Sequence, residues 1–130
     1  MQYMIMVLIV IGMAVADFVT GWIKAYINND VKSVKMRKGG MNKLGEVVVM
    51  LTACGLDIGI HALGQYYQAA ELAEIAGVVT AFAVFAYIVL MELVSILENY
   101  AAVNPDAQWA AKMIRRLKSA NENDKEEKHV

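Results

Sequence analysis

Long apolar blocks separated by polar segments dominate the pattern of this chain. Residues 4–23 and 44–63 form two blocks of 20 residues each, and residues 75–91 form a third of 17 residues. A helix needs about 20 mostly apolar residues to cross a bilayer. The pattern therefore predicts an all-α membrane protein with three transmembrane helices, over about residues 4–27, 44–63 and 75–97.

The remaining residues predict a division into a membrane domain, residues 1–103, and a cytoplasmic tail, residues 104–130. In the tail, Asn104 suits a helix cap and Pro105 the first helical position. Trp109, Met113 and Leu117 then repeat every four residues among basic side chains, which predicts a short amphipathic helix.

The apolar side of this tail helix could contact either of two surfaces. The first is the anionic inner leaflet of the membrane, and the second is a neighbouring subunit. Residues 121–130 are polar and mixed in charge, so we expect them to be disordered or loosely helical. The residues expected to contact the inner leaflet are Trp109, Lys112, Arg115 and Arg116.

The positive charges indicate how the chain is oriented. All twelve Lys and Arg residues lie within residues 24–43 or 112–128, and residues 64–71 contain none. Because basic loops stay in the cytoplasm, we expect residues 31–43 to form a cytoplasmic loop. The N-terminus would then lie outside and the C-terminus inside. The expected topology determinants are Lys32, Lys35, Arg37, Lys38 and Lys43.

One polar face interrupts the first apolar block. Asp17, Thr20, Gly21 and Lys24 are spaced i, i+3, i+4 and i+7, so they share one side of a helix whose other sides are apolar. A charge in hydrocarbon costs about 2.5–3.5 kcal/mol on insertion scales. This face should therefore meet protein or water.

The other two blocks also carry polar or small residues. Asp57 and His61 are spaced i, i+4 and could touch, whereas Gly55 and Gly59 form a small-xxx-small pair that admits a neighbouring helix. These groups either join helices by hydrogen bonds or line a water-filled path between assembled subunits. The candidate oligomerisation or pore-lining residues are Asp17, Thr20, Gly21, Lys24, Gly55, Asp57, Gly59, His61, Glu92 and Ser95.

No catalytic or cofactor chemistry is expected. Asp57 with His61 could form part of a metal or acid–base pair, but the second histidine is His129 in the tail. The sequence has no phosphate-binding Gly-rich loop and no nucleophile motif, and its basic segment lacks interleaved aromatics. We expect no enzyme, no metal, no cofactor and no nucleic-acid partner.

Four short motifs resemble those of a known family. In chain order they are Asp17-x-x-Thr20-Gly21-x-x-Lys24-Ala25 followed by Asn28, then Ser33 with Met36-Arg37-Lys38-Gly39 and Lys43, then Leu56-Asp57-Ile58, and last Glu92-x-x-Ser95-Ile96-Leu97-Glu98-Asn99. Their combination and order resemble the small phage holins, the group that includes toxin-secretion holins of the clostridial type. The resemblance ends at Pro105 and does not include the tail.

This resemblance implies a function in the cytoplasmic membrane of a bacterium. Such proteins form homo-oligomers there and open lesions that release an endolysin, a cell-wall hydrolase, or export a large toxin. Asp17→Asn or Lys24→Ala is then expected to shift the time of lysis. The residues alone leave two other functions open: a small oligomeric ion or solute channel or transporter subunit, and a membrane accessory or antiholin-like scaffold.

Overall fold

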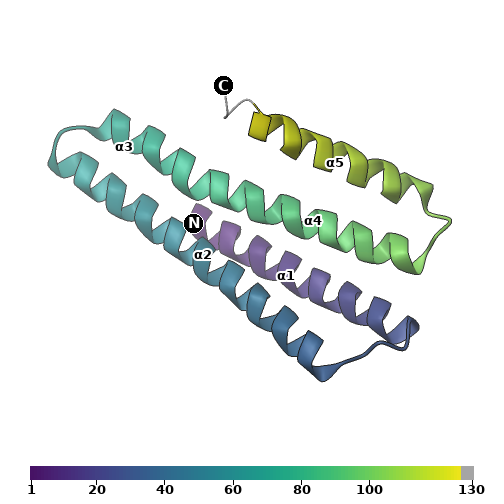
Figure 1. Ribbon diagram of the computed structural model, residues 1–130. Coiled ribbons are helices and arrows are strands. Elements are labelled where there is room, and N and C mark those ends of the chain that lie inside the picture. Colours follow the sequence, from purple (N-terminus) through teal and green to yellow (C-terminus); the bar gives the residue numbers. More distant parts are fainter. Residues whose placement is uncertain (127–130) are drawn as a thin grey trace.

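The computed structural model describes residues 1–126, which fold entirely into helices and short connections (Figure 1). Of residues 121–130, which we expect to be disordered or loosely helical, residues 121–126 are helical and residues 127–130 lie outside the described residues. The helices are α1 (Gln2–Ile27), α2 (Ser33–Tyr66), α3 (Ala70–Gly77), η1 (Val78–Phe82), α4 (Ala83–Val103) and α5 (Gln108–Glu126).

Three helices are long and apolar enough to cross a membrane, which confirms the predicted fold class. They are α1, α2 and the continuous helix formed by α3, the π-helical turn η1 and α4. The second and third have 34 residues each, or about 50 Å at 1.5 Å per residue. Hydrocarbon is only about 30 Å thick, so both helices are long enough to project beyond it.

The basic segment is helical, and the expectation of a loop over residues 31–43 is wrong. Helix α2 begins at Ser33, so only residues 28–32 connect α1 to α2. The segment is rich in Lys, Arg and Met, which favour helix. The positive-inside rule indicates on which side a segment lies, and it does not determine its conformation.

The two connections at opposite ends of α2 reverse the chain in the same way. Asn29 and Gln68 both have left-handed backbone conformations, with φ of 52° and 57°. After each reversal, an N–H donates back to a carbonyl near the end of the preceding helix. After the first reversal, the Asp30 backbone N–H donates to the Ala25 carbonyl at 2.9 Å.

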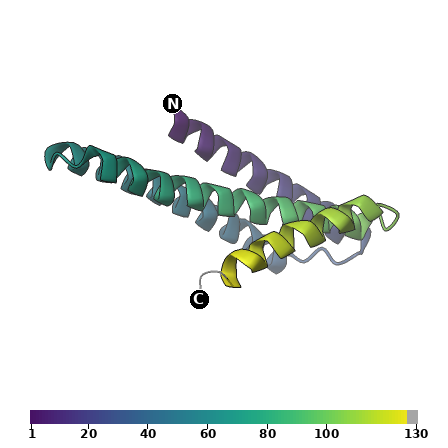
Figure 2. The ribbon, with the colours of Figure 1, turned by 90° about the horizontal axis from the view of Figure 1, so that it is seen from above.

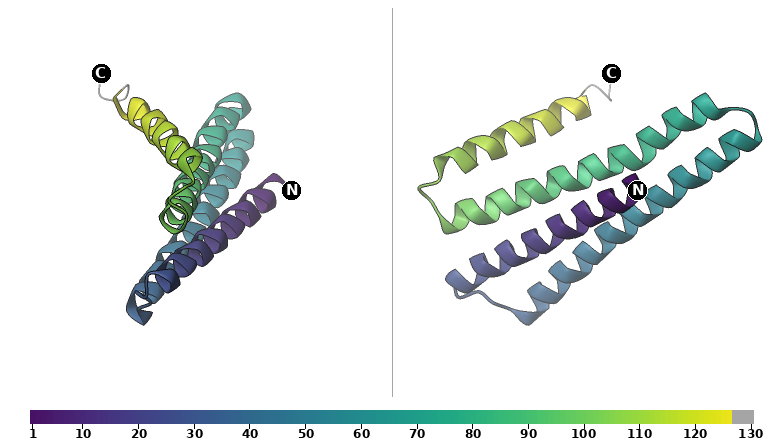
Figure 3. Two further views of the ribbon diagram at one scale, coloured as in Figure 1. Left: turned by 90° about the vertical axis from the view of Figure 1, so that its right-hand side faces the viewer. Right: turned by 180° about the vertical axis from the view of Figure 1, so that it is seen from behind.

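Helix α1 lies between α2 and α4, and it runs antiparallel to α2 and parallel to α4 (Figures 1 and 3). Val10, Met50, Cys54 and Ile88 are buried where the three helices meet. Beyond the N-terminus of α1, α2 packs directly on α3 and η1. A Cβ at Gly64 would overlap that of Ala73 there, so glycine is needed for this close approach.

Helix α5 turns back along α4 of the same chain and crosses it obliquely (Figure 2). Ala107, Ala110, Ile114 and Leu117 pack towards Leu93, Leu97 and Ala101. Lys118 Nζ lies 2.7 Å from Glu98 Oε1 on the flank of this contact. The tail helix is therefore amphipathic as predicted, and it packs on α4 of its own chain through a stripe that includes Leu117, whereas Trp109 and Met113 are exposed.

The start of α5 also differs from expectation. Pro105 lies in the turn between the two helices, and α5 begins three residues later at Gln108. Asn104 and Pro105 therefore do not cap the helix. The Ala107 N–H donates to the Asn104 carbonyl at 3.1 Å, so Asn104 acts through its backbone in the turn.

We predict that Gly77→Ala weakens the packing of α2 against the third spanning helix. A Cβ at Gly77 would overlap Asp57 Oδ1. Overpacking of this kind lowers the free energy of unfolding by about 1–3 kcal/mol. The measurement is the midpoint of thermal unfolding in detergent micelles.

Gly45→Ala is the matched control, because no atom lies within 4 Å of a Cβ built there. It should leave the midpoint unchanged or raise it slightly, since alanine favours helix. Equal midpoints for the two variants would contradict the packing described for Gly77.

Candidate functional site

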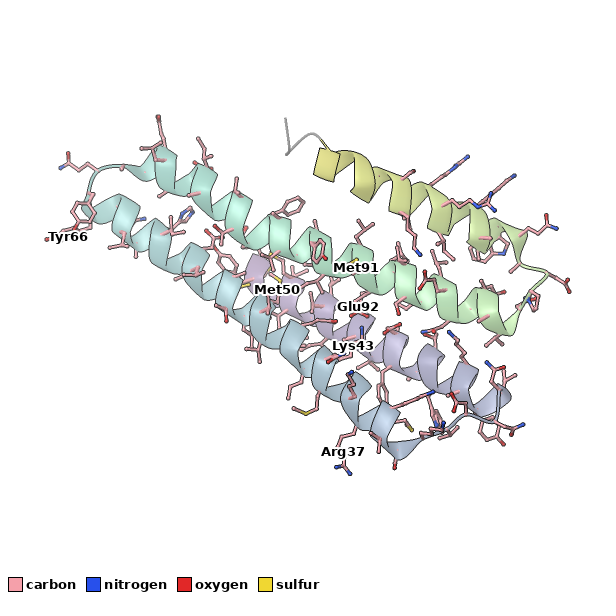
Figure 4. The ribbon with its side chains drawn as sticks, viewed as in Figure 1. Arg37, Lys43, Met50, Tyr66, Met91 and Glu92 are labelled. Carbon is pink, nitrogen blue, oxygen red and sulfur yellow. The ribbon has the colours of Figure 1, made fainter. Side chains whose placement is uncertain are left out.

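The ammonium group of Lys43 lies among three carboxylates, one from each membrane helix. Its Nζ is 2.9 Å from Asp17 Oδ2 on α1, 2.5 Å from Glu92 Oε1 on α4 and 3.5 Å from Glu46 Oε1 on α2 itself. Asp17 and Glu92 are buried, with exposed fractions of 8% and 2%. Figure 4 shows Lys43 and Glu92 on the inner sides of their helices, whereas Arg37 points away from the bundle.

A second layer of hydrogen bonds joins α1 to α4. Asn99 Nδ2 donates to Asp17 Oδ1 at 3.1 Å and lies 3.4 Å from Thr20 Oγ1. The Thr20 hydroxyl donates in turn to the Asp17 carbonyl at 3.0 Å. Gly21 lies next to this layer, and a Cβ at that position would make an ordinary contact with Asn99 Nδ2 at 3.5 Å. We name Asp17, Thr20, Lys43, Glu46, Glu92 and Asn99 the polar cluster.

The polar cluster contains more negative than positive charge. One ammonium faces three carboxyl groups, and the second oxygens of Glu46 and Glu92 are buried without a hydrogen-bond partner in the described part of the chain. Burying charge is costly unless each charge is paired. The cluster is thus held together through Lys43 and would gain from contact with water.

The helical periodicity explains why these residues meet. Asp17 and Thr20 follow each other on one side of α1, as the sequence predicted. Glu92 and Asn99, two turns apart, lie on the side of α4 that faces α1. Lys43 is close to the N-terminal end of α2, where its long side chain reaches inwards between them.

A cavity of about 330 Å³ opens next to the polar cluster. It lies between the C-terminal end of α1, the connection of residues 28–32 and the first turns of α2. Asp17, Lys43 and Asn99 form its inner end, and Lys24 contributes to its wall. The four residues of the predicted polar face on α1 therefore all border the cluster or this cavity.

Asp57 and His61 do not form the pair that their i, i+4 spacing allows. Asp57 is buried against Gly77, whereas His61 is exposed, and no ion pair or hydrogen bond joins them among the described residues. Asp57 Oδ1 has no hydrogen-bond partner in that part of the chain. Asp57 and His61 are one helical turn apart, but the neighbouring α3 covers only the first of them.

The remaining candidates lie elsewhere. Gly55 and Gly59 are exposed on α2, with no atom within 4 Å of a Cβ built at either position. Ser95 is half-buried on α4. Within the described residues, no three His, Cys, Asp or Glu side chains are grouped so that they could hold a metal ion.

The sequence indicates Lys43 as a topology determinant and as part of the family resemblance, but it does not reveal the place of Lys43 in the polar cluster. Lys43 and Glu92 are 49 residues apart in the sequence. The only local signal was Glu46, three residues after Lys43 and at ion-pair spacing on a helix. The other topology candidates, Lys32, Lys35, Arg37 and Lys38, are exposed.

Comparison with known proteins identifies one family. The sequence model of the bacteriophage holin family matches residues 1–119. The match includes most of α5, so the family likeness extends beyond Pro105 and the expectation that it excludes the tail is wrong. No curated protein and no solved structure matches the chain.

We predict that Lys43→Met destabilises the fold strongly, because it leaves the three carboxylates without their cation. Removing one partner of a buried ion pair costs about 3–5 kcal/mol. Thermal unfolding in detergent micelles measures this loss. Lys38→Met removes the same charge from the exposed side of the same helix and should change the midpoint little. Similar losses in both variants would contradict the central position of Lys43.

Proposed function

We propose that this chain, which belongs to the bacteriophage holin family, oligomerises in the bacterial cytoplasmic membrane and opens lesions there. These lesions would release an endolysin or export a large toxin. The chain is a multi-pass membrane protein of a family that is not a family of enzymes. The observation that carries the proposal is the polar cluster, which is closed within one chain although its charges are unbalanced.

The single chain is compatible with lipid because three acidic groups of its spans face inwards. Asp17, Glu92 and Asp57 are buried, and the outward surfaces of the spans present large apolar side chains such as Leu8, Leu51 and Val79. A monomer of this kind would accumulate in the bilayer without opening it. This property supports a holin, which must be harmless before lysis.

The exposed face of α2 supports self-association. Gly55 and Gly59 lie one helical turn apart with open space above them. In lipid, helices associate through small residues that allow close backbone contact. A second copy packed on this face would leave the polar cluster intact, so association and opening are separate steps.

Opening would follow from separation of α1 from α4. The Lys43 ammonium and the Asn99 amide join these helices, and an assembled ring could supply water in place of these contacts. Hydration favours the opened cluster because its three carboxylates repel one another. A membrane potential acts on such charges with about 2.3 kcal/mol per charge per 100 mV, so its collapse could set the time of opening.

The tail supports contact with the inner leaflet as a further part of the proposal. One side of α5 packs on α4, while Trp109, Lys112, Arg115 and Arg116 are exposed. Aromatic and basic side chains are those that interact with anionic headgroups. We therefore place the N-terminus outside and the C-terminus in the cytoplasm.

Release of markers from liposomes tests the proposed function. Vesicles containing purified protein are loaded with markers that range from small ions to a folded protein, and oligomer size is measured in the same membranes. Release of all markers together, once oligomers form, is the expected result. Saturable or ion-selective flux would indicate a channel or transporter, and tight vesicles would indicate an accessory or antiholin-like scaffold.

Glu46→Gln should delay lysis after induction in bacteria. Glu46 is the most weakly held carboxylate of the cluster, at 3.5 Å from Lys43, so its neutralisation lowers the repulsion without breaking the shorter contacts. We expect the onset to be later by a clear fraction of the normal delay at equal expression.

Glu71→Gln, in the first turn of α3, removes the same charge at an exposed position far from the cluster and serves as the control. An onset unchanged by Glu46→Gln, or delayed equally by both substitutions, would contradict a role for the cluster in timing.

A further inference from the structure

The mouth of the cavity beside the polar cluster carries a surplus of positive charge. Lys24, Lys32 and Lys35 line it, and Asp30 is the acidic side chain among the lining residues there. Asp30 is shared by two of them, with Oδ1 at 3.3 Å from Lys32 Nζ and Oδ2 at 2.5 Å from Lys35 Nζ. These lysines lower the pKa of Asp30, so it remains charged at neutral pH.

The inner end of the cavity has the opposite character. Lys43 also lines the cavity, but Asp17 and Glu92 already pair with it. A bound anion would therefore be attracted to the mouth and repelled from the inner end. This arrangement favours a ligand with one compact anionic group held at the mouth.

The wall between these two ends is largely apolar. Phe18, Trp22 and Met36 contribute side chains, while Gly21 and Gly39 leave room. A free inorganic ion would make no favourable contact with an apolar wall. The glycerol and first methylenes next to a lipid phosphate would pack against it. Trp22 is also half-exposed, as is common for tryptophan at a membrane interface.

The cavity lies at the level where lipid headgroups would be. It is bounded by the end of one spanning helix and the start of the next, joined by residues 28–32. In the proposed orientation this is the cytoplasmic leaflet, where basic pockets between membrane helices can hold anionic headgroups.

We propose that this cavity binds a phosphate group, supplied by the headgroup of an anionic phospholipid. The phosphate would lie at the mouth between Lys24 and Lys35, and the glycerol would lie against Trp22. The site is separate from the proposed inner-leaflet contact of α5. It does not depend on lesion formation, so it can be tested in closed membranes.

Trp22 fluorescence provides a direct readout in a Trp109→Phe background. The full chain is placed in neutral phosphatidylcholine nanodiscs containing increasing fractions of phosphatidylglycerol. We expect a change in Trp22 emission that saturates at a low fraction of the anionic lipid. Lys24→Gln should raise the half-saturating fraction about fivefold, the effect typical of one lysine near a membrane surface.

Two further variants distinguish binding in this cavity from general electrostatic attraction to the anionic membrane. Lys38→Gln changes net charge equally but lies outside the cavity lining, so it should leave the half-saturating fraction unchanged. Asp30→Asn should lower it, because Lys32 and Lys35 are then freed from their shared carboxylate. Because a misfolded variant would not bind more tightly, the gain of binding expected for Asp30→Asn cannot result from misfolding.

In the last experiment, inorganic phosphate is titrated into the protein in nanodiscs of phosphatidylcholine alone. Little response at millimolar phosphate supports the lipid as the source. Saturation by inorganic phosphate with equal effect would overturn the assignment to lipid. A response that rises linearly with phosphatidylglycerol, or equal losses in Lys24→Gln and Lys38→Gln, would overturn the site itself.

Discussion

The membrane part of this protein depends on one partly buried ammonium group that holds three helices through their carboxylates. Lys43 reaches Asp17 on α1 and Glu92 on α4 from its own position on α2. Each of these acids alone would be expensive in a bilayer. Together with the lysine they form a closed cluster in which carboxyl groups outnumber the ammonium group. The pairing stabilises the single chain, whereas contact with water would solvate the charges that remain unpaired.

The lipid environment explains how the membrane helices pack against one another. The outward faces must be apolar, so hydrophobic burial alone cannot determine how the helices pack. Contacts are instead fixed by polar pairing near the Lys43 end and by small residues near the other, where Gly64 meets Ala73 and Gly77 meets Asp57. The proposed self-association through Gly55 and Gly59, on the exposed face of α2, would leave the interior undisturbed. This separation suits a holin, which accumulates before it acts.

The sequence allowed the spans and the polar face of α1 to be predicted, because block length and helical spacing are local properties. The partner of that face could not be predicted, since Lys43 meets Glu92 only after the helices pack. The helical start of α2 was missed because charge segregation does not fix conformation. In the tail, two stripes with helical spacing compete, and the one with Ala107 and Ala110 packs because its small side chains allow α5 to approach α4 closely.

We expect the polar cluster to be closed within each chain before lysis and opened to water afterwards. Thr20→Cys, in a Cys54→Ala background, places a small thiol beside Asn99 and Asp17 with little change in size. Its reaction with a water-soluble maleimide is measured in membranes isolated before and after the onset of lysis, with the outward-facing Ile9→Cys as the control. Labelling at position 20 only after onset, with none at position 9 in either sample, is the predicted result. Equal labelling at position 20 before and after onset would contradict it.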